Sequence, residues 1–142
     1  MTITRDQPKI GTELMRQFLP HSPFVAHTRI ELARIDDGYA ELTLPFHEEI
    51  VTIGEVIHGG AIVTLIDTAA MAAAWAGADV PEQLRGATVS LSVNYLAPAE
   101  GADITATAQV LRRGHRLTNV RVDVHTDGAT HVATAIVTYQ IG

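Results

Sequence analysis

The residues with the clearest chemical potential are the motif His58-Gly59-Gly60 and an acid, Asp67, nine residues after the histidine. Asp67 is the only formally charged residue between Glu55 and Asp79, in a segment made almost entirely of small or apolar residues. Such surroundings disfavour an ionised carboxylate unless a partner or hydrogen bonds compensate, and acids held in this way are often functional. Asp67 is therefore a candidate base, and a buried acid that only caps or pairs structurally is the alternative.

The glycine pair stands where this apolar segment begins. Gly59 and Gly60 can present bare backbone N–H groups at the start of a helix, where anions are stabilised. A base combined with an anion-stabilising site is what acyl transfer or hydrolysis requires. Close packing of the helix on a sheet also favours glycine, and the two roles are compatible.

Composition limits the classes of protein to consider. The 142 residues, 46% hydrophobic and 18% charged, predict one globular domain over residues 1–142 rather than a disordered chain. The net charge of -6 and the lack of a long basic run disfavour nucleic-acid binding. The absence of cysteine excludes disulfides and thiolate catalysis. The seven histidines form no pair at metal-ligand spacing, so we expect no metal and no cofactor.

The apolar segment Val56–Ala78 is long enough to span a membrane, for which about 20 residues suffice. It contains His58, Asp67 and many alanines, however, and lacks flanking Lys or Arg anchors. We therefore interpret it as a buried central helix and expect no membrane insertion. The polar start, Met1–Lys9, has no signal-peptide core, so we expect a cytoplasmic protein.

Hydrophobic periodicity and turn residues predict a short amphipathic helix, two strands, a long helix and four further strands. The expected elements span Pro8–Leu19, Phe24–Ile35, Tyr39–Leu44, Val56–Ala78, Thr88–Tyr95, Ile104–Val110, Val120–Val124 and Val132–Tyr139. Residues 1–20 thus form an N-terminal helical extension that ends at Pro20. The remaining order, ββαββββ, predicts an α+β fold in which an antiparallel sheet curls around the apolar helix. Trp75 and Met71 on that helix are expected in the core.

This order, with the stretches GEVIHGGAIVTLIDTAA and GATVSLSVNYLAPAEG, resembles the hotdog-fold acyl-CoA thioesterases of the phenylacetic-acid-degradation type. The resemblance runs from about Phe24 to the end, and Tyr95-x-x-Pro98-Ala99 supports it independently. It implies hydrolysis of an acyl-CoA thioester to a free acid and coenzyme A.

The resemblance also implies roles for individual residues. Asp67 matches the catalytic acid, which acts as a general base on water or as a nucleophile. Gly59 matches the backbone donor that polarises the thioester carbonyl, with Gly60 beside it. His58 matches the histidine that supports this loop, and Thr88 matches the hydroxyl that helps to hold the attacking water. Thr88 also begins a strand face with Ser90, Ser92 and Asn94, so an exposed or interface threonine is the alternative.

Substrate-binding residues are predicted at two further places. Thr52 stands where many relatives carry an Asn or Gln that contacts the thioester, which is a departure from the family pattern. Arg112, Arg113 and Arg116 flank the turn at Gly114 and could bind the phosphates of coenzyme A, although exposed arginines are common at turns.

The spacing of the motif also bears on assembly. Asp67 lies about 12 Å along the helix axis from Gly59, because an α-helix rises about 1.5 Å per residue. One carbonyl cannot contact both groups of the same chain. We therefore expect a homodimer with shared active sites, assembling into a homotetramer.

Two other functions remain open at this point. Hotdog dehydratases or hydratases use a histidine and an acid together, and His58 with Asp67 could serve that chemistry, although the spacing fits the thioesterase pattern better. A non-catalytic acyl-CoA sensor or carrier on the same fold is the second. Hydration of an enoyl thioester, or binding without turnover, would distinguish them.

Overall fold

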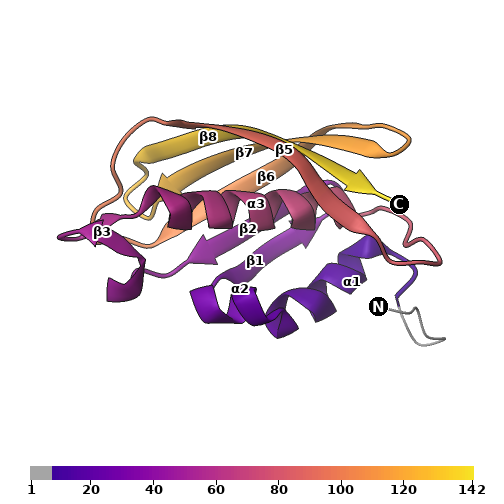
Figure 1. The fold of residues 1–142 in the computed structure, drawn as a ribbon, viewed down its shortest axis with the longest axis horizontal. Helices are drawn as coiled ribbons and strands as arrows, with labels where there is room; N and C mark the ends of the chain where they lie inside the picture. The colour runs from indigo at the N-terminus through magenta and orange to yellow at the C-terminus, as the bar shows by residue number, and fades with distance from the viewer. Residues whose placement is uncertain (1–7) are drawn as a thin grey trace.

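A six-stranded antiparallel sheet wraps around one long helix in the computed structural model, which describes residues 8–142 (Figure 1). The strand order across the sheet is β1-β2-β6-β7-β8-β5. The strands are β1 Glu31–Asp36, β2 Tyr39–Leu44, β5 Gly86–Tyr95, β6 Ile104–Arg113, β7 Leu117–Thr126 and β8 His131–Ile141. The helix, α3 (Gly59–Trp75), lies along one face of the sheet. The predicted α+β arrangement is confirmed.

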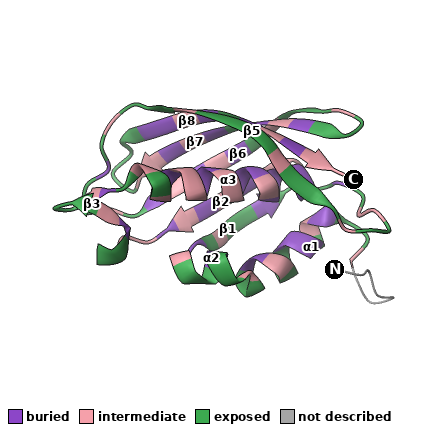
Figure 2. Cartoon of the chain, in the orientation of Figure 1, coloured by how far each residue is buried: buried purple, intermediate pink, exposed green. Residues whose placement is uncertain are grey.

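The core lies between α3 and the strands that face it (Figure 2). Alternate residues of the four inner strands turn toward the helix, as the period of a strand requires. Those buried are Ala40, Leu42, Leu44, Ile104, Ala106, Ala108, Val120, Val122, Val124, Val132, Ala133, Ala135, Val137 and Tyr139. The matching face of α3 is mostly alanine, at positions 69, 70 and 72–74.

The exposure of α3 follows the prediction of a buried central helix. Trp75 is buried in the core as expected, whereas Met71 is only half-buried. Within residues 8–142, no helix combines the length and the apolar character that a membrane span needs.

The start of α3 differs from the prediction. Val56–Ile57 form a short strand, β4, which pairs with β3 (Val51–Ile53) in a separate two-stranded sheet. The helix begins only after His58, whose backbone is extended. It ends before Gly77, where a φ of +83° leaves the right-handed region.

Two helices precede the sheet. α1 (Gly11–Phe18) lies within the predicted helix, and Pro20 falls in a following 3-10 turn, Leu19–His21. The predicted strand Phe24–Ile35 is wrong in its first half, because α2 (Pro23–Thr28) occupies it. Proline is favoured in the first turn of a helix, since it lacks a donor that would be unpaired there.

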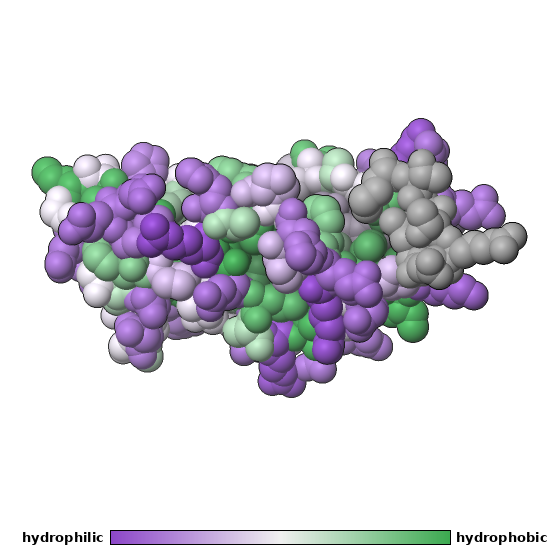
Figure 3. Space-filling view, turned by 90° about the horizontal axis from the view of Figure 1, so that it is seen from below, coloured by the Kyte–Doolittle hydropathy of each residue, from purple (hydrophilic) through white to green (hydrophobic). Residues whose placement is uncertain are grey.

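α1 and α2 lie together below the sheet in Figure 1. Seen from that side, the surface is mixed, with apolar side chains showing between polar ones (Figure 3). α1 approaches the end of α3 closely. A Cβ on Gly11 would collide with the carbonyl of Trp75, and the Gly11 N–H donates to the Ala78 carbonyl at 2.8 Å.

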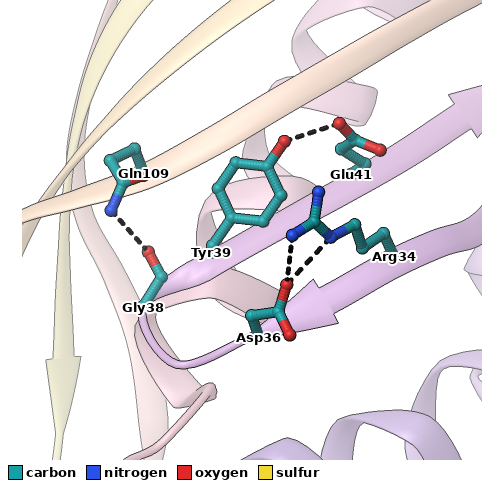
Figure 4. Close-up of polar contacts among 6 residues, drawn as sticks. All are labelled: Arg34, Asp36, Gly38, Tyr39, Glu41 and Gln109. Carbon is teal, nitrogen blue, oxygen red and sulfur yellow. Dashed lines mark hydrogen bonds and ion pairs between the residues drawn. The ribbon is translucent and has the colours of Figure 1, made fainter.

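The predicted turn at Asp36-Asp37-Gly38 is confirmed, with Gly38 at a φ of +65°. Polar side chains cover the strands beside it (Figure 4). Arg34 donates to Asp36 at 2.8 Å and lies over the ring of Tyr39. Tyr39 donates to Glu41, and this bond, followed by burial, raises the pKa of Tyr39. These contacts join residues of β1 and β2 at the outer edge of the sheet.

Candidate active site

His58 caps the N-terminus of α3. Its Nδ1 accepts a hydrogen bond from the Gly60 N–H at 2.7 Å, so Nδ1 carries no proton in this arrangement. The carbonyl of His58 accepts from the N–H groups of Ala61 and Ile62. His58 thus holds the loop before α3, and its part in the reaction stays a prediction. Gly60 is held by the cap, and its N–H is therefore already paired.

Gly59 is the first residue of α3. Its N–H donates to no acceptor among residues 8–142. Its carbonyl accepts from the hydroxyl of Tyr95 at 2.9 Å, and a Cβ added to Gly59 would lie 3.2 Å from that hydroxyl. Tyr95 thus packs against a glycine and fixes its peptide. The N–H remains available at the positive end of the helix dipole, which suits an anionic oxygen.

Asp67 lies in the middle of α3 and is half-buried. One carboxylate oxygen, Oδ1, accepts a hydrogen bond from the Thr88 hydroxyl at 2.6 Å. Thr88 is on β5, so the bond joins the helix to the edge strand of the sheet. The other oxygen, Oδ2, has no hydrogen bond within residues 8–142. Asp67 is therefore an oriented carboxylate with one oxygen free for chemistry.

A β-bulge explains why Thr88 reaches Asp67. The pairing of β5 with β8 shifts between Thr88 and Ser90, so that Thr88 opposes Tyr139 and Ser90 opposes Thr138. The extra residue reverses the alternation, which places Thr88 on the helix side of the sheet and Ser90 on the other side. The predicted polar face shared by Thr88, Ser90, Ser92 and Asn94 is therefore wrong at its first member.

Asp67 borders a pocket of about 260 Å³ that Thr88 and Tyr139 also line. Burial raises the pKa of Tyr139, and the nearby charge of Asp67 acts in the same direction, so this phenol stays neutral. A second pocket, of about 290 Å³, lies at the start of the helix beside His58 and Gly60. Phe24 of α2 lines both pockets. The two pockets therefore lie one after the other along α3, with Phe24 between them.

The three arginines lie at the opposite end of α3. Arg113 donates through its guanidinium to the carbonyls of Ala74 at 2.6 Å and Ala76 at 3.1 Å. These carbonyls end the helix, where cations are favoured. Arg112 and Arg116 are exposed beside the same turn. Ala74 is fifteen residues after Gly59, so this end lies about 22 Å from Gly59 in the same chain.

Thr52 lies on β3 and is exposed. The strand pair that carries it leads directly into α3, and the His58 N–H donates to the Ile50 carbonyl at 2.8 Å. Thr52 therefore lies at the end of the molecule that holds Gly59, but the structure gives its hydroxyl no partner within residues 8–142.

Two tyrosines were missed as site residues. Tyr95 fixes Gly59, and Tyr139 lines the pocket at Asp67. Tyr95 belongs to the motif Tyr95-x-x-Pro98-Ala99, which supports the family resemblance, but the sequence alone assigned no role to the tyrosine. Tyr139 gives no local signal, because its position depends on the pairing of β8 with β5. Among residues 8–142, no cluster of three or more His, Asp or Glu side chains could hold a metal ion.

Proteins with similar sequences include thioesterases and esterases. Residues 54–133 match the family model described as the thioesterase superfamily. The medium/long-chain acyl-CoA thioesterase YigI of Salmonella typhimurium is 29% identical over 140 residues, covering 88% of this chain and 89% of YigI. A putative esterase of Halobacterium salinarum is 31% identical over 120 residues, covering 82% of this chain and 79% of the esterase.

Solved structures agree with these matches. A thioesterase family protein from Silicibacter pomeroyi superposes with a TM-score of 0.84 at 25% identity, covering 92% of this chain and 97% of that protein. The PaaI protein of Escherichia coli, from the phenylacetic acid degradation operon, superposes with a TM-score of 0.80 at 20% identity, covering 93% of each chain. The predicted hotdog fold is thereby confirmed.

The contacts of Arg113 predict a structural role that can be measured. Arg113→Met should lower the free energy of unfolding by about 1–2 kcal/mol, because two carbonyls at the helix end lose a charged donor. Urea unfolding followed by circular dichroism measures the change. Arg112→Met, at the neighbouring exposed position, is the matched control and should unfold like the unmodified protein. Equal stability of the two variants would show that the cap contributes nothing.

Proposed function

The chain belongs to the thioesterase superfamily, and we propose that it hydrolyses an acyl-CoA thioester to a free acid and coenzyme A, with Asp67 as the catalytic carboxylate. The observation that carries the proposal is the setting of Asp67. It is the one acid on an apolar helix, it borders a pocket, and the Thr88 hydroxyl fixes one of its oxygens at 2.6 Å. The acyl-CoA thioesterase YigI, with 29% identity, supports the substrate class.

The free oxygen of Asp67 can act in either of two ways. As a general base it accepts a proton from water, and the resulting hydroxide adds to the thioester carbonyl. As a nucleophile it attacks the carbonyl itself, which gives a mixed anhydride that water then cleaves. In both routes the carbon–sulfur bond breaks and the sulfur leaves as coenzyme A thiolate, which then takes a proton. Thr88 holds the carboxylate in one orientation throughout.

The carbonyl oxygen becomes negative in the tetrahedral intermediate and needs a donor. The Gly59 N–H meets this need, because it is unpaired among residues 8–142 and lies at the start of α3. Its neighbour Gly60 is bound to His58, so we assign Gly60 to shaping the loop.

One chain does not bring these two groups together. Gly59 and Asp67 are eight residues apart on one helix, which is about 12 Å along its axis. We therefore place the active site at a homodimer interface, where Gly59 of one chain meets Asp67 of its partner. β5 offers the surface for this contact. It is an edge strand, and Val89, Tyr95 and Leu96 at or just beyond it are more than half exposed. Further pairing into a homotetramer stays a prediction.

The rest of the substrate would extend away from this centre. We assign Arg112 and Arg116 to the phosphates of coenzyme A, because their charged groups are exposed while that of Arg113 caps the helix. Thr52, beside the helix start, would face the thioester where relatives carry an amide.

The first prediction concerns the carboxylate. Asp67→Asn should lower kcat by about 10²–10⁴-fold, because the amide can still accept from Thr88 but can neither take a proton nor attack. Thiol release from a panel of acyl-CoA substrates measures the rate, and thermal unfolding shows that the fold is kept. Asp127→Asn in an exposed turn is the matched control and should stay fully active. Activity of Asp67→Asn above about a tenth would remove Asp67 from the mechanism.

The second prediction concerns Thr88, which positions Asp67. Thr88→Val keeps the shape but removes the donor, and kcat should fall about 10–100-fold, since a hydrogen bond to a charged group contributes about 1.5–3 kcal/mol. KM should change little, because Thr88 contacts the carboxylate and not the coenzyme. Thr88→Ser restores the hydroxyl and should recover most of the rate. Equal loss in both variants would mean that the hydroxyl is not the group required.

The third prediction tests the shared site. Gly59→Pro removes the donor and suits the backbone, because proline is accepted at the first helical position and His58 before it is extended. Gly59→Ala keeps the N–H and is the matched control. Gly59→Pro and Asp67→Asn chains, each inactive alone, should regain about a quarter of full activity when mixed and exchanged, since half of the dimers are mixed and each has one intact site. No recovery after proven exchange would mean that each chain works alone.

A further inference from the structure

An apolar pocket of about 300 Å³ lies deeper along α3, beyond Asp67. It is bounded by side chains of α1, of α3 and of the segment before β5. Its walls are formed by Leu14, Met15, Phe18, Met71, Trp75 and Leu84, with Gly86 and Tyr139 at one side. None of these side chains carries a charge while Tyr139 is neutral.

This deep pocket is continuous with the one at Asp67. Phe18, Met71, Gly86 and Tyr139 line both. Glycine is required at position 86, because a Cβ there would collide with the Tyr139 hydroxyl and lie 2.9 Å from the Trp75 ring. The lack of a side chain therefore keeps the passage between the two pockets open.

The helix sets the direction of the passage. Asp67, Met71 and Trp75 are four residues apart, so they lie on one face of α3, one turn after another. These three residues form a stripe that starts at the Asp67 carboxylate and ends at Trp75. There the indole Nε1 donates to the Tyr139 hydroxyl at 3.0 Å. The polar atoms of Trp75 and Tyr139 are thus bonded to each other, which leaves an uncharged and mainly apolar wall.

The length of the stripe limits what fits. Eight residues of helix span about 12 Å. An extended chain advances about 3.5 Å for every three bonds, so 12 Å holds about ten bonds. We propose, on the basis of the proposed function, that this pocket binds the acyl tail of the thioester, and that the tail is an unbranched aliphatic chain of about eight to ten carbons. In this proposal Leu84, which lines the same pocket as Trp75, limits the length of the chain.

Leu84 suits a test because it lies outside the helices and strands and is only partly buried. Leu84→Phe should shorten the preferred chain by about two carbons and lower kcat/KM for decanoyl-CoA at least threefold relative to butyryl-CoA. Leu84→Ala should shift the preference the other way, toward longer chains. Leu111→Phe and Leu111→Ala, at an exposed position on β6, are the matched controls and should leave the profile unchanged. An unshifted profile in both Leu84 variants, or a preference for benzoyl-CoA over decanoyl-CoA, would overturn the proposal.

A binding measurement separates this proposal from the proposed function. Trp75 is the single tryptophan of the chain and lines this pocket, so its fluorescence reports on what the pocket binds. S-decyl-coenzyme A, a thioether that cannot be hydrolysed, should shift the Trp75 emission, and S-ethyl-coenzyme A should not. Leu84→Phe should weaken decyl binding at least threefold. A shift without any thioester hydrolysis would reject the function and keep the pocket, whereas hydrolysis of decanoyl-CoA without a shift would reject the pocket alone.

Discussion

α3 can lie against the concave face of the sheet because the side that it turns to the strands is largely alanine. Ala69, Ala70 and Ala72–Ala74 are fully buried, and α3 packs against β2, β6, β7 and β8. Close packing of this kind leaves the helix one position only. Asp67 and Gly59 are part of that helix, so their separation and direction are as fixed as the core. Gly11 extends the same constraint to α1, since a Cβ there would collide with the Trp75 carbonyl.

Much of this arrangement could be predicted from the sequence, because its signals are local. The sequence itself shows that Asp67 is the one acid in an apolar segment and that a glycine pair stands near the start of that segment. Hydrophobic alternation and the turn at Gly38 located β2 and its partner strands. The long helix was predicted too early by three residues, because Val56 and Ile57 are as apolar as the helix itself, and only their pairing with β3 makes them a strand.

Most of the features that escaped prediction depend on contacts between distant segments. Thr88 and Asp67 are twenty-one residues apart, and they meet because a bulge reverses the alternation of β5. Arg113 and Ala74 are thirty-nine residues apart, and nothing near Arg113 distinguishes a helix cap from a phosphate ligand. α2 was mistaken for a strand because Phe24 and Val25 favour strands, whereas the preceding Pro23 starts a helix turn.

Because α3 holds Gly59 and Asp67 about 12 Å apart, the proposed reaction needs one group from each of two chains. Met71 and Trp75 follow Asp67 on the same face of α3, so the chain that supplies the carboxylate also supplies the pocket for the acyl tail. In the proposed dimer, the Gly59 N–H that would polarise the carbonyl comes from the partner. Preference for a particular acyl length would then be a property of one chain, whereas the rate of hydrolysis would depend on how both chains meet at β5. Changes along the pocket can therefore alter the choice of substrate without disturbing the interface that carries out the chemistry.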